Sequence, residues 1–162
     1  MSLPVTSVPG RTSIIIPCFN QSPYVGSCIE SVLAQRLENA EIIVVNGGST
    51  DDSAARIQAF GDRVKYVAQP NGGLSNARNT EITHAPGEFI QFLDADDSLG
   101  QQAISRRINR LQQGGAGIAV CRKRLFTATD ARGQPRVTGE CGLPGGAYAV
   151  HLCRFNSGPL HA

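Results

Sequence analysis

The sequence lacks several features that define large classes of proteins. It has no apolar run long enough to span a bilayer, and it does not begin with a basic segment followed by an apolar one. It therefore predicts no transmembrane segment and no signal peptide. A formal net charge of only +2 gives no reason to expect nucleic acid as a partner. Internal repeats and low-complexity linkers are also missing. What remains is one ordinary globular core, which 162 residues with 41% hydrophobic content can bury.

Cysteine is present in an odd number and in no recognisable pattern. None of the five cysteines has C-x-x-C spacing, whereas a disulfide framework or a zinc site would need paired residues. We therefore expect reduced thiols and a soluble cytoplasmic protein, acting in the cytoplasm or at the inner face of the membrane. The five are Cys18, Cys28, Cys121, Cys141 and Cys153.

Strand-like and helix-like segments alternate over the first hundred residues. Short apolar runs rich in β-branched residues are typical of buried parallel strands, and stretches with apolar residues at helical spacing separate them. This alternation predicts an α/β fold, a mostly parallel sheet flanked by helices. The predicted strands are 14–16, 42–45, 64–67 and 89–93, and the predicted helices are 24–35, a segment capped by 49–52 and ending near 60, and 74–83.

The later part of the chain is less regular. We predict a helix over 101–113, a strand over 118–121 and a turn at 130–133 that joins an antiparallel pair. Beyond residue 139, glycines and prolines interrupt any periodicity. We interpret 12–162 as a single domain and 1–11 as leader residues.

The most informative feature is the acid cluster Asp94-Ala95-Asp96-Asp97, which directly follows the apolar run 89–93. Three carboxylates in four positions repel one another, and folding alone gives no reason to gather them there. A divalent cation such as Mg²⁺ or Mn²⁺ would neutralise them, because hard cations prefer oxygen ligands. Ligands bind at the carboxyl ends of strands in open α/β sheets. The cluster therefore predicts a cation site shared with an anionic ligand.

The loops after the other predicted strands are polar or flexible. They carry Pro17-Cys18-Phe19-Asn20, Asn46-Gly47-Gly48-Ser49 and Asn71-Gly72-Gly73, and the same edge of the sheet would bring them together. Each loop alone is compatible with an ordinary turn. Together they fit a nucleotide site, in which Phe19 offers a face for a base and glycines let backbone N–H groups approach an anion.

These motifs, taken in order, resemble the nucleotide-binding part of family 2 glycosyltransferases, which have the GT-A fold. The segment 14–20 resembles the opening strand and its P-x-[YF]-N loop, and 29–35 resembles the first helix. The segment 41–51 resembles the second strand and G-S-T-D turn, 71–79 matches N-G-G-x-S-x-A-R-N, and 87–97 matches the strand with its D-x-D-D motif.

The resemblance implies inverting transfer of a sugar from a nucleoside-diphosphate sugar, with UDP the expected nucleotide. It implies a saccharide or lipid-linked acceptor in the synthesis of cell-surface polysaccharide or glycolipid, and Mg²⁺ or Mn²⁺ as cofactor. The donor-binding residues that it implies are Pro17, Phe19, Asn46, Arg78, Asp94 and Asp96, with Asp96 and Asp97 as metal ligands.

The sequence departs from the family pattern in two places. One or two aspartates usually end the second strand, where this chain has Asn46 and Gly47. Because a charge-assisted hydrogen bond is about twice as strong as a neutral one, we expect weaker donor binding or a changed nucleotide preference. Second, neither Asp130 nor Glu140 resembles the family's catalytic base, so the catalytic residue is not identifiable here. We therefore expect a domain truncated at its C-terminus.

Other functions fit the sequence less well. A non-catalytic nucleotide-sugar-binding module is the main alternative, favoured by Asn46-Gly47 and by the missing base. A dinucleotide oxidoreductase would need G-x-G-x-x-G after the first strand, and a phospho-receiver domain would place its acids elsewhere. An activated Cys18 near His84 or His151 is a further alternative, although a buried, inert cysteine is commoner. The sequence does not indicate an oligomeric state.

Overall fold

A computed structural model of the chain describes residues 7–70, 84–114, 118–120, 123–129, 135–141 and 151–154, with side chains as far as residue 119. The predicted helix 74–83, with Arg78 and the segment 71–79, lies outside the described residues.

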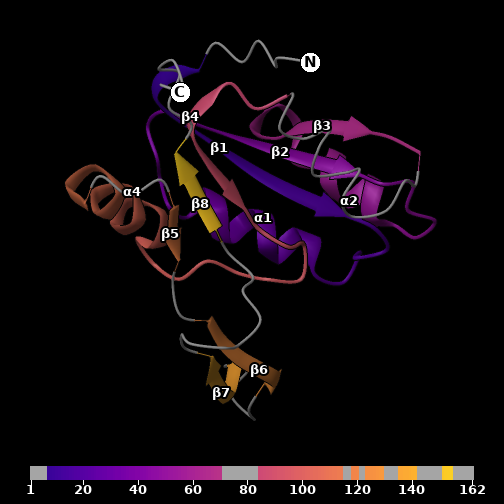
Figure 1. Ribbon diagram of the computed structural model, residues 1–162. Coiled ribbons are helices and arrows are strands. Elements are labelled where there is room, and N and C mark those ends of the chain that lie inside the picture. Colours follow the sequence, from indigo (N-terminus) through magenta and orange to yellow (C-terminus); the bar gives the residue numbers. More distant parts are fainter. Residues whose placement is uncertain are drawn as a thin grey trace.

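A six-stranded sheet forms the centre of the molecule, with strand order β3-β2-β1-β4-β8-β5 (Figure 1). The strands β1, β2, β3 and β4 are mutually parallel, and β8 is antiparallel to both of its neighbours. This confirms the predicted α/β fold with a mostly parallel sheet. The strands are β1 (Val8–Cys18), β2 (Ala40–Asn46), β3 (Lys65–Ala68), β4 (Gly87–Phe92), β5 (Ile118–Val120) and β8 (His151–Arg154).

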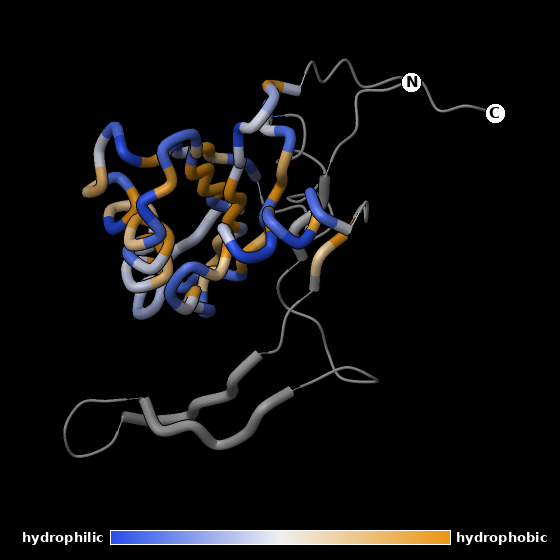
Figure 2. The backbone as a smooth tube through the Cα atoms, turned by 90° about the vertical axis from the view of Figure 1, so that its left-hand side faces the viewer, coloured by the Kyte–Doolittle hydropathy of each residue, from blue (hydrophilic) through white to orange (hydrophobic). Residues whose placement is uncertain are grey.

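The wholly apolar runs of the sequence are buried on both faces of the sheet. Alternate side chains point to opposite faces, so Ile14 and Ile16 join the core beneath α1 (Val25–Leu33), while Ile15 packs on the other face with Ile43. Figure 2 shows these hydrophobic segments gathered in the middle of the body. The described residues also form the helices α2 (Ser53–Gln58) and α4 (Ala103–Gly114) and the 3₁₀ turn η1 (Gly61–Arg63).

The first strand is longer than its apolar run suggests. It begins at Val8, so residues 8–11 of the predicted leader are part of the sheet. A shift in register between Val8 and Thr12 accompanies Gly10, whose φ of 73° is in the left-handed region. On the adjacent strand, a Cβ at Gly87 would lie 2.6 Å from the Ser13 nitrogen, so only glycine allows this close approach.

The later part of the chain contains one strand that the sequence pattern misses. The strands β6 (Lys123–Thr129) and β7 (Pro135–Cys141) form the predicted antiparallel pair, and Figure 1 shows them apart from the main sheet. The predicted turn at 130–133 lies outside the described residues. The chain then returns as β8, which inserts between β4 and β5. Among the described residues, no helix has the length and apolar character that a membrane span requires.

Candidate donor-binding site

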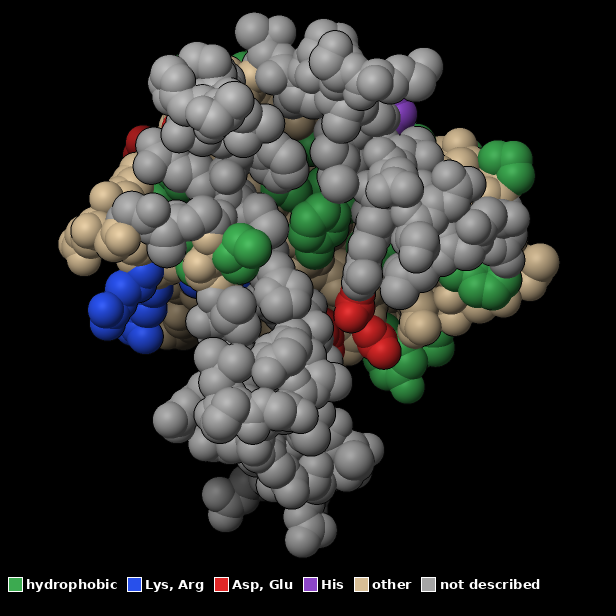
Figure 3. All heavy atoms as spheres, in the orientation of Figure 1, with side chains coloured by type: hydrophobic (Ala, Val, Ile, Leu, Met, Phe, Trp, Pro, Cys, Tyr) green, Lys and Arg blue, Asp and Glu red, His purple; other side chains and the backbone are tan. Residues whose placement is uncertain are grey.

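The acid cluster forms a tight turn directly after β4. Leu93 is fully buried and its N–H bonds the Ile15 carbonyl at 2.9 Å, which fixes the last residue before the acids. The Asp97 N–H then donates to the Asp94 carbonyl at 2.9 Å and closes the turn. Asp96 is exposed, and Asp94 and Asp97 are partly buried. Figure 3 shows acidic side chains together on the face of the molecule that Figure 1 displays.

The acid turn packs against α1. The Cys28 thiol donates to the Asp94 carbonyl oxygen at 3.5 Å. Burial, and to a lesser extent the neighbouring carboxylate of Asp97, raises the pKa of the Cys28 thiol well above its ordinary range. This cysteine is therefore an unreactive packing residue beneath the acid turn.

The loops after β1 and β2 are fastened to each other by side chains. The Asn20 N–H donates to Ser49 Oγ at 3.0 Å, and the Thr50 N–H donates to Asn20 Oδ1 at 2.8 Å. Asn20 has a φ of 52°, a left-handed conformation that asparagine tolerates better than most residues. The result is a fixed loop on which Phe19 is 46% exposed, as a base-stacking residue would need to be.

Two further hydrogen bonds extend this connection toward α1. The Gln21 N–H donates to Ser53 Oγ at 3.0 Å, and the Ser22 N–H donates to Asp51 Oδ2 at 3.0 Å. The Ser53 hydroxyl, together with the backbone N–H groups of Ser22 and Ser53, lowers the pKa of Asp51. Asp51 is thus held as a carboxylate that ties two loops together, a role that the sequence pattern did not reveal.

Asn46 has both ends of its side chain engaged within the protein. It is 5% exposed, its Oδ1 accepts the Ser49 N–H at 3.0 Å, and its Nδ2 donates to the Tyr66 hydroxyl at 3.0 Å. The adjacent Gly47 donates its N–H to the Cys18 carbonyl at 2.9 Å. Asn46 therefore shapes the loop, and its contact with a nucleotide stays a prediction.

The other predicted residues have different surroundings. Pro17 is buried within β1, opposite Val45, so it supports the loop from below. Burial raises the pKa of the Cys18 thiol, which is the opposite of what an activated thiol requires. His84 is exposed, and the side chain of His151 is not among those described.

The carboxylates of the acid turn fit a metal that the substrate helps to hold. Among the described residues, no group of three or more His, Cys, Asp or Glu side chains converges as a complete metal site. Mg²⁺ does not require one, since it is commonly bound by one or two carboxylates together with substrate phosphates. The exposed Asp96 and partly buried Asp94 and Asp97 supply oxygen ligands of that kind.

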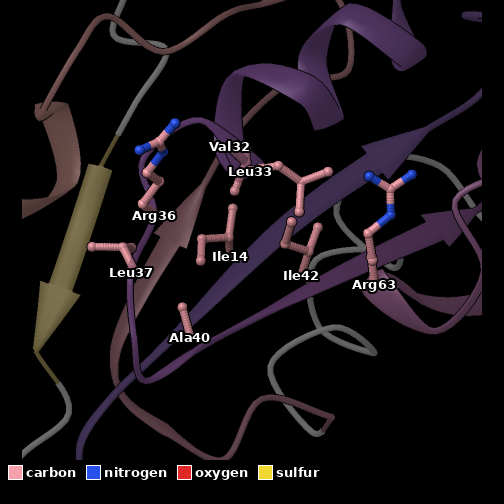
Figure 4. A pocket seen from close by; sticks show the side chains of 8 residues that line it. All are labelled: Ile14, Val32, Leu33, Arg36, Leu37, Ala40, Ile42 and Arg63. Atoms are coloured by element: carbon pink, nitrogen blue, oxygen red, sulfur yellow. The ribbon is translucent and has the colours of Figure 1, made fainter.

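A pocket of about 120 Å³ lies at the opposite edge of the sheet (Figure 4). The end of α1, the beginning of β2 and the 3₁₀ turn η1 line it. Most of the lining side chains are apolar, and Arg36 and Arg63 are the two charged ones. Since α1 runs antiparallel to the strands, this pocket is at the amino edge and is separate from the acid turn.

Comparison with known proteins decides the family. The model of glycosyl transferase family 2 matches residues 13–141, which include both loops and the acid turn. The chain belongs to glycosyl transferase family 2. It is 35% identical over 116 residues to the glycosyltransferase GlyA of Streptococcus pneumoniae, and 38% identical over 112 residues to the uncharacterized glycosyltransferase EpsJ of Bacillus subtilis.

Solved structures show the same fold. TarS of S. aureus, residues 1–349, superposes with a TM-score of 0.62 at 23% identity, over 67% of this chain and 34% of that one. The mannosyltransferase PcManGT of Pyrobaculum calidifontis, in complex with GDP-Man and Mn²⁺, gives a TM-score of 0.63 at 21% identity, over 75% of this chain and 39% of that one. These likenesses establish the GT-A fold that the sequence predicted.

This family 2 chain spans only part of its relatives. The match covers 70% of the chain but 17% of GlyA, and 67% of the chain but 33% of EpsJ.

Proposed function

We propose that the protein is a divalent-metal-dependent glycosyltransferase that uses a nucleoside-diphosphate sugar, with UDP as the nucleotide. The observation that carries the proposal is the acid turn after β4, which lies at the same sheet edge as the fastened loop displaying Phe19. Membership of family 2 supports it, as does TarS, which has been solved in complex with UDP-GlcNAc.

Each residue of the site has a role in this proposal. Phe19 stacks on the base, while Asp94 and Asp96 bind the ribose side and the metal, and Asp97 shares the metal. A divalent cation would act as a Lewis acid, offsetting the charge that develops on the leaving diphosphate. The Mn²⁺ in the complex of PcManGT with GDP-Man supports this choice of cofactor.

The reaction, acceptor and location belong to the same proposal. Transfer inverts the anomeric carbon, the acceptor is a saccharide or a lipid-linked saccharide of the cell surface, and the reaction takes place on the cytoplasmic side of the membrane. Arg78 is a further candidate for the nucleotide contacts.

A nucleotide-sugar-binding module without transfer activity is the second candidate. Two observations favour it. The Asn46 side chain is already hydrogen-bonded at both ends, and Gly47 has no side chain to offer the nucleotide. Donor binding without sugar transfer would select this alternative.

Calorimetric titration of UDP, with Mn²⁺ and again with EDTA, tests the proposal. We expect binding that requires the metal and that Asp96→Asn weakens by about tenfold or more, because the variant loses one charged ligand oxygen. The matched control is Asp62→Asn, an exposed carboxylate on η1, which should leave the affinity unchanged. Equal losses in the two variants, or binding unaffected by EDTA, would contradict the site assignment.

A further inference from the structure

One side of the first helix lies along the segment that follows β4. Cys28 contacts the Asp94 carbonyl at 3.5 Å, and Ser31 Oγ accepts the Leu99 N–H at 3.0 Å. In the turn after the helix, Gln35 Nε2 donates to the Gly100 carbonyl at 3.0 Å. Residues three and four apart share one face of a helix, so these contacts define a continuous stripe.

Tyr24 is the next position of this stripe toward the carboxyl edge. It is four residues before Cys28, and its carbonyl accepts the Cys28 N–H at 3.0 Å, so it already has helical spacing. Side chains on a helix tilt toward its N-terminus, which for α1 is the end nearest the carboxyl edge of the sheet. The helical spacing therefore places Tyr24 one turn before Cys28, on the side of α1 that faces the acid turn.

Tyr24 is largely exposed, in contrast to the next residue of the stripe. It is 55% exposed, whereas Cys28 is 1% exposed. Among the described side chains, the exposed large hydrophobic ones are Val8, Phe19, Tyr24 and Ile118, so both aromatic members of this set are on the connection between β1 and α1. That connection is fastened through Asn20, Gln21 and Ser22, so the ring is presented by a fixed backbone.

The sugar ring of the donor is the part of the substrate expected next to the acid turn. In a nucleoside-diphosphate sugar the anomeric carbon is bonded to the terminal phosphate, so the sugar is one bond from the diphosphate. If the acid turn holds the diphosphate, a side chain beside the turn lies within reach of the sugar, while Phe19 is taken by the base. Tyrosine combines a broad apolar face with a polar tip, which matches the mixed C–H and O–H surface of a pyranose.

We propose that Tyr24 contacts the sugar ring of the nucleotide-sugar donor and contributes to the choice of that sugar. This inference rests on the proposed function, and it assigns a residue that neither the sequence motifs nor the family match singles out.

The test compares donor binding with nucleotide binding in the same protein. UDP, UDP-glucose, UDP-galactose and UDP-GlcNAc are titrated into the wild type with Mn²⁺, and the sugar donor bound most tightly is then titrated into each variant. We expect Tyr24→Ala to leave the Kd for UDP unchanged and to raise the Kd for that donor about three- to tenfold, the range of one aromatic contact. Tyr24→Phe keeps the ring but lacks the hydroxyl, so it should lose clearly less affinity for the donor than Tyr24→Ala.

The controls separate a sugar contact from a structural effect. Ile118→Ala removes a side chain of similar exposure from β5 and should change neither Kd. Tyr24 makes no side-chain cap on α1, so Tyr24→Ala should keep the melting temperature. Equal changes for UDP and the donor, no change for the donor, or a loss in Tyr24→Phe as large as in Tyr24→Ala would overturn the inference. Failure of the wild type to bind any of the four compounds would instead contradict the proposed function, and the inference with it.

Discussion

Replacing Gly47 with aspartate should strengthen donor binding. Family 2 chains usually have one or two aspartates at this point, and the structure shows that position 47 can accept one. A Cβ there would lie 3.7 Å from the Cys18 carbonyl oxygen, an ordinary van der Waals distance, and Gly47 is outside the left-handed region. The neighbouring Gly48 has a φ of 76°, so the same substitution there would be strained. Gly47→Asp therefore adds a carboxylate without disturbing the loop.

The expected gain follows from the strength of one charge-assisted hydrogen bond. A hydrogen bond to a charged group contributes about 1.5–3 kcal/mol, which corresponds to about a ten- to hundredfold decrease in Kd. The backbone bond of Gly47 to Cys18, at 2.9 Å, is kept, so the new side chain does not replace an existing contact. The nearby carboxylate of Asp51 opposes a second negative charge, so we expect the lower end of this range.

Calorimetric titration of UDP with Mn²⁺ measures this gain directly. Gly47→Asn is the matched control, because it has nearly the same shape but no charge, and it should gain clearly less. The reasoning is refuted if Gly47→Asp binds UDP no better than the wild type while keeping its melting temperature, or if Gly47→Asn gains as much.

Three further predictions concern stability and reactivity. Gly87→Ala should lower the free energy of unfolding by about 1–3 kcal/mol, because its Cβ would be 2.6 Å from the Ser13 nitrogen, whereas Gly100→Ala, with open space around it, should have little effect in urea titrations. The folded-state pKa of Asp51 is lowered, so its carboxylate stabilises the fold above the pKa of the unfolded chain, and this stabilisation is lost as pH falls through the folded-state pKa. In urea titrations, Asp51→Asn should therefore be less stable than the wild type at about pH 6. The two proteins should become similar in stability at about pH 3. The buried Cys28 thiol should resist iodoacetamide in the native protein and react in urea, as read by mass spectrometry of its peptide; native labelling at the unfolded rate would contradict its burial.

The parallel half of the sheet could be predicted because its strands are buried on both faces. The run 14–16 is wholly apolar and does not alternate with polar residues, which is typical of a strand covered on both faces. In the structure, all three isoleucines are 0% exposed. The strand β8 could not be predicted in this way. It is four residues long, and its place between β4 and β5 is set by pairing with strands distant in the sequence. The start of β1 was also missed, because residues 8–10 are exposed and only their pairing makes them a strand.

The acid turn and the Phe19 loop were predictable because neighbouring carboxylates repel one another and an exposed aromatic side chain is unfavourable in water unless a ligand covers it. Three neighbouring carboxylates and an aromatic residue after a buried strand stand out in the sequence itself. The fastening of the loops was not predictable, since Ser49, Asp51 and Ser53 are common turn and capping residues whose partners lie about thirty positions away. Tyr24 was missed for a related reason, because only its exposure distinguishes it from a helical core residue.

The structure also separates the two departures from the family pattern, which look alike in the sequence. At position 46 the side chain accepts an N–H from Ser49 and meets the Tyr66 hydroxyl, and an aspartate could accept from both of these groups. Asparagine therefore preserves the shape of the loop, and its side chain is largely buried. At position 47 nothing replaces the lost side chain. Because position 47 contributes only its backbone N–H to the bonds between the loops, and the side-chain bonds come from other residues, a missing carboxylate there should weaken the nucleotide contact without disordering the site. Impaired donor binding in this chain would then be a deficit at one residue, and one substitution would repair it.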